Sequence, residues 1–218
     1  MIPICESIFI LVIFLCWLHG WKVQGREFFL LFFFPAFLFG VFTEEMAIAW
    51  NDLYRLQSGF WFLANVPVTV GLWWSYLLYL ALYLSEGLVG GSLSTGKGAG
   101  AVLGVFPLVT GILSLALSEV WTRTGLIAWF PFVGGEGTMR PAGRALLLAL
   151  AHAGGGGLFV LAFHFLLNRA WKNQSRVLCL MLAAPLLALL SEGWFWGVTA
   201  TVRLWSGAVG GFLMGGGR

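Results

Sequence analysis

Long apolar segments separated by short polar connections dominate the hydrophobic pattern of this chain. A helix needs about 20 mostly apolar residues to cross the hydrocarbon core of a bilayer. Six segments reach this length: 2–19, 28–50, 60–84, 101–121, 145–167 and 177–199. A weaker stretch, 200–214, contains Arg203 and several glycines, and it predicts either a short seventh helix or an interfacial tail. The pattern therefore predicts an all-α polytopic membrane helical bundle of six to seven transmembrane helices.

None of the connections is long enough to hold a second folded unit, so residues 1–218 are expected to form a single integral membrane domain. The composition agrees, because 60% of the residues are hydrophobic and only 10% are charged, against about 25% charged in soluble domains. We expect a multi-pass protein of the plasma (inner) membrane. Basic residues are shared equally between the two faces, so the positive-inside rule leaves the orientation open.

Several classes of function are disfavoured by the polar residues. The net charge is only +3 and there is no basic run, so no nucleic-acid partner is expected. The three cysteines are scattered through apolar runs without disulfide or zinc spacing. His152 and His164 are twelve residues apart on one predicted helix, about 18 Å, which is too far to share a metal ion. We therefore expect neither a metal site nor a cofactor.

Four glutamates interrupt the apolar segments: Glu44, Glu45, Glu119 and Glu192. An ionisable residue inside a membrane helix costs about 2.5–3.5 kcal/mol even on insertion scales, so such a residue is a functional candidate by default. The second, fourth and sixth predicted helices run in one direction, and all four glutamates lie in their C-terminal halves. They are therefore expected in the same leaflet, where they could share a site.

We take Glu45, Glu192, Glu119 and Asp52 as the catalytic candidates. Glu192 has no basic residue near it in the sequence except Arg203, eleven residues later. A carboxyl group isolated in apolar surroundings tends to be protonated, as a general acid requires. Glu45 and Asp52 would share a helix face if the helix continued to Tyr54. Two simpler explanations stay open. Glu119 could form a helical ion pair with Arg123, and Glu44 or Glu45 could serve only to hydrogen-bond a neighbouring helix.

Polar and aromatic residues near these acids are the expected substrate contacts: Glu44, Tyr54, Asn65, Trp73, Trp121, His152 and Trp194. Aromatic rings could line a polyene or isoprenoid chain, or could simply form the interfacial belt common in membrane proteins. Four consecutive glycines, Gly154–Gly157, follow His152. They allow close helix packing, approach of a flat ligand or local unwinding.

Two short stretches resemble the membrane-embedded carotenoid hydratases of the bisanhydrobacterioruberin hydratase type. The first comprises Glu45, then Asn51-Asp52-Leu53-Tyr54, then Asn65-Val66-Pro67-Val68 and Trp73-Trp74. The second, Glu119…Gly125…Trp129, is similar to the family's second acidic segment. The chain differs from the family in residues 130–141, which lack the expected tyrosines. The resemblance covers about residues 25–130 and implies that Glu45 and Glu119 are catalytic and that water is added to a carotenoid end.

These observations favour an enzyme of isoprenoid or carotenoid metabolism that works without a cofactor. A protonated glutamate would donate a proton to a terminal C=C bond, and a second carboxylate would activate water or remove a proton, giving hydration, isomerisation or cyclisation. The alternative is a non-catalytic subunit of a larger membrane complex that contacts lipid, pigment or partner membrane subunits. A proton or solute transporter that uses the acids as a relay is a third possibility.

Overall fold

The computed structural model describes residues 2–51, 54–57, 61–125, 127–129, 141–169 and 172–208. Six helices in these ranges are long and apolar enough to span a membrane, which confirms the all-α bundle and makes the chain a multi-pass membrane protein. They are α1 (Ile2–Gln24), α2 (Arg26–Asn51), α3 (Val68–Val89), α4 (Ala99–Thr124), α5 (Pro141–Leu167) and α6 (Asn173–Ala208).

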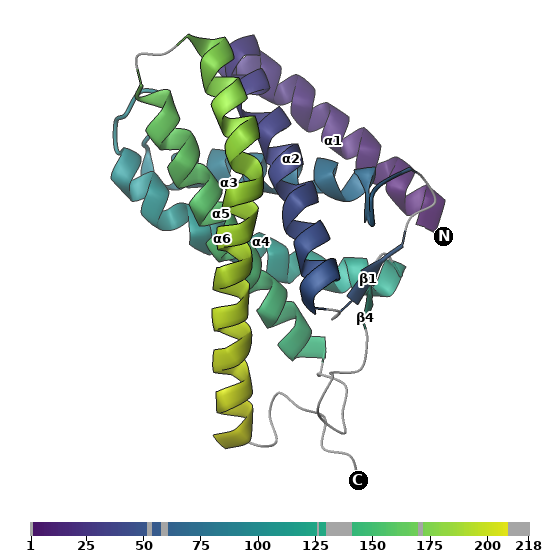
Figure 1. Cartoon of the computed structure of the whole chain (residues 1–218). Coiled ribbons are helices and arrows are strands. Elements are labelled where there is room, and N and C mark those ends of the chain that lie inside the picture. The colour runs from purple at the N-terminus through teal and green to yellow at the C-terminus, as the bar shows by residue number, and fades with distance from the viewer. Residues whose placement is uncertain are drawn as a thin grey trace.

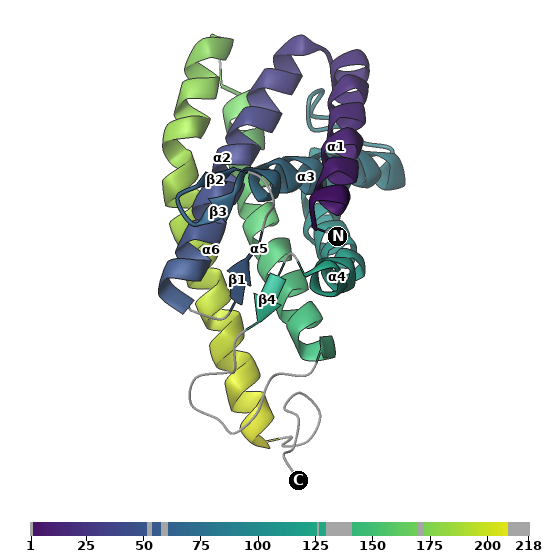
Figure 2. The ribbon, with the colours of Figure 1, turned by 90° about the vertical axis from the view of Figure 1, so that its right-hand side faces the viewer.

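Helix α2 lies near the centre of the bundle and runs beside α6 in the same direction (Figure 1). Helix α3 crosses both of them steeply (Figures 1 and 2). Helices α2 and α3 bury the largest share of their residues, whereas α1 packs mainly against these two helices and buries the smallest share. This arrangement places the C-terminal half of α2 beside the middle of α6, whose last turns extend beyond the end of α2 (Figure 1).

The third helix begins at Val68 and not near residue 60, as the hydrophobic pattern predicts. Residues before it form a small hairpin, in which β2 (Phe62–Leu63) pairs with β3 (Val66–Pro67). Pro67 disfavours helical backbone at the residue before it, and it lies at the N-cap with φ −59° and ψ 139°. The apolar run therefore contains a turn before the helix.

Two further expectations about helix ends need correction. Helix α2 ends at Asn51 and does not continue to Tyr54, which instead begins strand β1 (Tyr54–Leu56). Strand β1 pairs antiparallel with β4 (Ile127–Trp129), so the α2–α3 connection is tied to the α4–α5 connection. Residues 200–208 extend α6, so in the described part of 200–214 there is no separate seventh helix.

Phenylalanine rings form the centre of the core between α2 and α5. Phe32 lies edge-on to Phe159 and to Phe163, with ring centroids 5.5 and 5.0 Å apart. All three side chains are fully buried. Edge-to-face pairs of this kind are each worth about 0.5–1.5 kcal/mol beyond the burial of their area. These contacts hold α5 against α2 and so fix the position of His152 relative to Glu44.

Glycines bring the helices into close contact. A Cβ atom on Gly154 would lie 2.1 Å from Trp194 Nε1, and one on Gly155 would lie 2.4 Å from Ser191 Oγ, both on α6. On α2, a Cβ on Gly40 would lie 2.3 Å from the Cβ of Trp74. Helix α5 is continuous through Gly154–Gly157. Of the three explanations for the glycine run, close helix packing is therefore the one that this geometry supports.

Gly40→Ala should destabilise the fold, because the added methyl group would overlap the rigid stem of the buried Trp74 ring. Overpacking of this kind costs about 1–3 kcal/mol. Gly104→Ala is the matched control, since nothing lies within 4 Å of a Cβ at that helical position. Thermal unfolding in detergent should show a lower midpoint for Gly40→Ala alone. Equal midpoints for the two variants would contradict the packing of α2 on α3.

Candidate functional site

The carboxyl group of Glu44 lies at the centre of a buried polar cluster. Its side chain projects from α2, and the residue is 3% exposed. Tyr54 Oη donates a hydrogen bond of 2.8 Å to Oε2, and Trp74 Nε1 donates one of 2.9 Å to Oε1. Both oxygens thus accept a hydrogen bond, which offsets part of the cost of removing a carboxylate from water.

His152 of α5 lies next to Glu44. Its Nε2 is 3.8 Å from Glu44 Oε1, and its Nδ1 is hydrogen-bonded at 2.6 Å to Ser114 Oγ of α4. The ring also contacts Trp74 edge-on, with centroids 4.6 Å apart. Four helices therefore contribute side chains to one hydrogen-bonded and electrostatic cluster. The imidazole is held in one orientation between a hydroxyl group and a carboxyl group.

Glu192 lines the same cavity as Glu44. The residue is 2% exposed, and the cavity between the two helices has a volume of about 20 Å³, which is room for about one water molecule. Tyr54, Trp74, His152 and Ser191 also line it. Two carboxyl groups from α2 and α6 thus face one small space. The sequence-based expectation that Glu44 and Glu192 lie in the same leaflet agrees with this arrangement.

Strand β1 places Tyr54 over the cavity. The pairing of Tyr54 with Trp129 across the two short strands holds it there, outside the membrane-spanning helices. Burial raises the pKa of the Tyr54 phenol well above its ordinary value, and the negative charge of Glu44, the hydrogen bond to Glu44 and the charge of Glu192 raise it further. The phenol therefore keeps its proton and acts as a hydrogen-bond donor to Glu44.

The side chain of Glu45 points away from the cavity of Glu44 and toward the β2–β3 hairpin. Both of its carboxyl oxygens accept hydrogen bonds from Asn65, one from the backbone N–H at 2.9 Å and one from Nδ2 at 2.6 Å. These bonds hold the turn of the β2–β3 hairpin, where Ala64 adopts a positive φ of 55°. Glu45, expected as a catalytic residue, and Asn65, expected as a substrate contact, thus bind each other. Glu44, and not Glu45, faces the cavity. Asp52 lies outside the described residues.

Glu119 does not join the buried cluster. Its side chain is 51% exposed and accepts a 2.7 Å hydrogen bond from Arg123 Nε, four residues on. This is the helical ion pair that its spacing allowed. Trp194 also lies on an outer face, where its Nε1 donates to the carbonyl oxygen of Leu150 at 2.8 Å and its ring covers Gly154.

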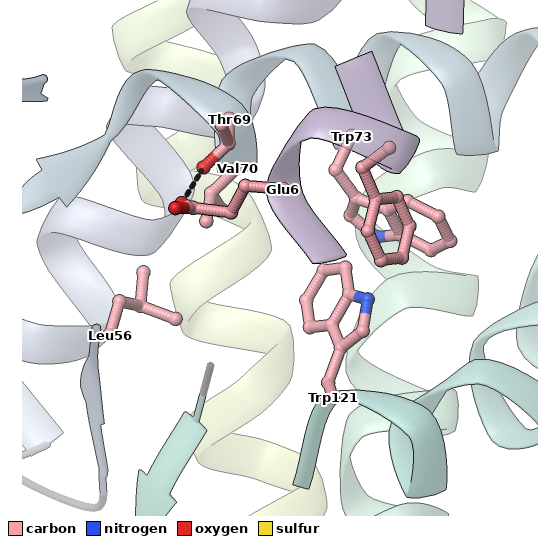
Figure 3. Close-up of a pocket in the computed structure, with 7 residues that line it drawn as sticks. Glu6, Leu56, Thr69, Val70, Trp73 and Trp121 are labelled. Carbon is pink, nitrogen blue, oxygen red and sulfur yellow. Dashed lines mark hydrogen bonds between the residues drawn. The ribbon is translucent and has the colours of Figure 1, made fainter. Parts of the chain in front are cut away.

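Trp73 and Trp121 are buried and pack against each other, with centroids 4.7 Å apart. They do not line the cavity of Glu44 but a neighbouring one, into which Glu6 of α1 and Thr69 of α3 also point (Figure 3). Thr69 Oγ1 donates a hydrogen bond of 3.1 Å to Glu6 Oε1. Glu6 is 1% exposed, so it is another acidic side chain that the bundle buries.

Sequence reasoning missed Glu6, Ser114, Ser118 and Ser191 as parts of these polar cavities. One signal was available on the fourth helix. Ser114, Ser118 and Trp121 are spaced by four and three residues, which places them on one helix face. This face and His152 line another small cavity, which lies between the cavity of Glu6 and that of Glu44. Glu6, near the start of the first apolar segment, has no comparable pattern around it.

No group of three or more histidine, cysteine, aspartate or glutamate side chains could hold a metal ion in the described part of the chain. What the cavity does offer is proton donors and acceptors: two carboxyl groups, a phenol, an imidazole and the hydroxyl groups of Thr43 and Ser191. Such groups can transfer protons to and from an apolar substrate without a metal. In comparisons with protein-family models, curated proteins and solved structures, nothing was found that matches the chain.

Tyr54→Phe should change how stability depends on pH. An unfolded tyrosine loses its proton near pH 10, about its ordinary pKa, whereas the folded protein keeps the proton because the pKa of Tyr54 is raised. The contribution of Tyr54 to stability is thus fully present below about pH 10 and is lost as the pH rises toward the folded pKa. Above pH 10 the melting temperature in detergent should fall more steeply for the wild type than for Tyr54→Phe. Parallel slopes would contradict the burial of this phenol.

Glu45→Gln should weaken the hairpin and leave the buried cluster in place. A glutamine offers one acceptor oxygen to Asn65 where the glutamate offers two. Hydrogen bonds to charged groups are worth about 1.5–3 kcal/mol, and less here because Asn65 is exposed to solvent. Proteolysis within the α2–α3 connection should therefore become faster. Cleavage at an unchanged rate would show that Glu45 does not hold this turn.

Proposed function

We propose that this protein is a membrane-embedded acid/base enzyme that acts on the terminal C=C bond of an isoprenoid or carotenoid, most simply as a hydratase in the plasma (inner) membrane. The observation that carries the proposal is the cavity that Glu44 and Glu192 line together within the apolar bundle. Buried ionisable groups are costly in a membrane protein and mark functional sites by default. The resemblance of residues 25–130 to carotenoid hydratases suggests the same class of reaction, but the acids that it implies, Glu45 and Glu119, lie outside this cavity.

We assign the roles of the two carboxyl groups from the hydrogen bonds that Glu44 accepts. Glu44 accepts hydrogen bonds on both oxygens and is the base. Glu192 is the acid: it donates a proton to the terminal carbon of the double bond, and a tertiary carbocation forms. A water molecule adds to the cation through its oxygen, and Glu44 takes the proton that this water releases. Return of that proton to Glu192 completes the cycle, so the net reaction is the addition of one water molecule.

Aromatic rings beside the carboxyl groups suit a cationic intermediate. Trp74 and Phe195 line the cavity, and the face of an aromatic ring attracts a cation by about 0.5–2 kcal/mol, more when water is excluded. The same rings keep bulk water away from the cation. Removal of a proton from the cation by Glu44, without addition of water, would give isomerisation or cyclisation by the same groups.

The outer surface of α4, α5 and α6 offers a place for the apolar tail of such a substrate. A groove of about 540 Å³ runs there, lined by residues that include Pro107, Gly154, Leu161 and Trp194. Its size falls within the range of about 300–1,000 Å³ typical of small-molecule sites. The side chains of Leu161 and Trp194 are half exposed on membrane-spanning helices, so a lipid-like chain can reach the groove from the bilayer. This groove and the cavity of Glu44 and Glu192 have no lining residue in common, so α5 and α6 must move apart for the C=C bond to reach the carboxyl groups.

Glu44→Gln and Glu192→Gln should each abolish product formation in a cell that makes an acyclic carotenoid. General acid or base catalysis by one group typically contributes about 100-fold or more. The measurement is the fraction of substrate that gains water, read by chromatography and mass spectrometry. Glu119→Gln is the matched control, because this carboxyl group is half exposed and paired with Arg123. Glu192→Gln and Glu119→Gln should purify in the same amount as the wild type. Glu44→Gln leaves one of two buried donors, Tyr54 or Trp74, without an acceptor and should purify less well, so product is normalised to the amount of folded protein.

Unchanged product with Glu44→Gln and Glu192→Gln would overturn the proposal. So would purification of the wild type with a stable stoichiometric partner and no bound isoprenoid, which would favour the role of a non-catalytic subunit. Release of an isoprenoid or carotenoid from the purified lone chain, detected by absorbance and mass spectrometry, would support the enzyme.

A further inference from the structure

Three small cavities lie in series between Glu6 and the carboxyl groups of Glu44 and Glu192. The first contains Glu6 and Thr69 in its wall and ends at Trp73 and Trp121 (Figure 3). The second shares both tryptophans with the first and reaches His152. The third shares His152 and Leu148 with the second and contains Glu44 and Glu192. Each cavity is therefore separated from the next by only one or two side chains.

Their size and lining suit single water molecules. The volumes are about 20, 10 and 20 Å³, and a water molecule needs about 10–15 Å³ by this measure together with two to four polar partners. The first cavity offers Glu6 and Thr69, the second Ser114, Ser118 and His152, and the third the hydroxyl and carboxyl groups of the site. A cavity lined only by apolar side chains stays dry. Each of these three cavities has polar side chains in its wall.

Two buried polar atoms point to the same conclusion. Trp121 Nε1, which belongs to the wall between the first two cavities, has no hydrogen-bonding partner among the described residues. Thr43 Oγ1, in the third cavity, has none in this part of the chain either. The two residues are 6% and 8% exposed. An unpaired buried donor or acceptor costs about 1–3 kcal/mol, and a water molecule in each cavity would remove that cost.

The first cavity adjoins a larger pocket that is open to the outside of the protein. Leu56 lines the first cavity and, on its other side, a wide open pocket of about 470 Å³. The pocket includes the exposed residues Arg55 and Asn65 of the α2–α3 connection, and Ile48 near the C-terminal end of the α2 span. Water at the membrane surface can thus approach the first cavity past a single leucine side chain.

We propose that this series of cavities is a hydration path that carries water from the membrane surface to the buried carboxyl groups. Its ligand is water, held in turn by Glu6–Thr69, by Ser114–Ser118–His152 and by Glu44–Glu192. The purpose of the path rests on the proposed function, because a hydratase consumes one water molecule for each double bond and its site is closed off by apolar side chains. The path itself is a property of the bundle and can be tested without substrate.

X-ray radiolytic footprinting of the full-length protein in detergent tests the path. Hydroxyl radicals form at bound water and modify aromatic rings beside it, which mass spectrometry measures. Rates are normalised to those of the same residue in the denatured chain. We expect Trp73, Trp121 and Trp74 to be modified several-fold faster than Phe159, although all four are buried. Equal, low rates for all four would overturn the proposal.

A variant that blocks the second cavity tests whether water reaches the third cavity through it. Ser118→Val adds bulk to the second cavity, so it should lower the modification of Trp74, in the third cavity, several-fold. Ser85→Val is the matched control, because Ser85 is also buried and its hydroxyl also donates only to a backbone carbonyl of its own helix. The path would be contradicted if the modification rate of Trp74 fell equally in both variants, or if it fell in neither variant.

The same variants separate the path from the function. Fast modification of the tryptophans combined with full product formation by Glu44→Gln would leave the path in place and overturn the proposed enzyme. Slow modification of the tryptophans, combined with loss of product in Glu44→Gln and Glu192→Gln, would overturn the path and support the proposed enzyme. If both ideas hold, Ser118→Val also slows hydration in the carotenoid-producing cell several-fold, and Ser85→Val does not.

Discussion

The burial of the Glu44 carboxyl group is the constraint on which the rest of this structure depends. A carboxylate cannot be removed from water unless other groups replace the lost hydrogen bonds. Tyr54 and Trp74 do so, at 2.8 and 2.9 Å. To bring them there, the chain leaves α2 at Asn51 and enters strand β1, and α3 crosses close to α2 at Gly40. The end of α2, strand β1 and the close contact of α2 with α3 thus together place the two donors at the Glu44 carboxyl group.

Small residues and polar residues work together in this bundle. Gly40, Gly154 and Gly155 let neighbouring helices approach so closely that Trp74, Trp194 and Ser191 lie directly over a helix backbone. Close approach also brings Ser114, His152 and Glu44 within reach of one another, although they belong to three helices. In a bilayer, where apolar surfaces gain little by leaving lipid, such packing and polar contacts are the main forces that hold helices together.

The polar groups do not form one compact site but extend from Glu6 to Glu192 through small cavities. Under the proposed function, the two carboxyl groups would need an apolar enclosure that protects a carbocation and also a route for the water that ends the reaction. A row of cavities, each with room for about one water molecule, would meet both needs. The wide apolar groove on α4–α6 would leave the lipid-like part of the substrate in the bilayer.

Hydrophobic segments of spanning length determined the six helices and their approximate positions, because the bilayer thickness fixes how many apolar residues a helix needs. The sequence also singled out Glu44, Glu45, Glu119 and Glu192 as costly residues in apolar segments. Their different surroundings came only from the tertiary structure. Adjacent residues on a helix point about 100° apart, so the rotation of α2 about its own axis decides whether Glu44 or Glu45 faces the core. That rotation is set by the packing of Trp74 against Gly40 and by the β2–β3 hairpin that binds Glu45, contacts between segments that no local pattern encodes.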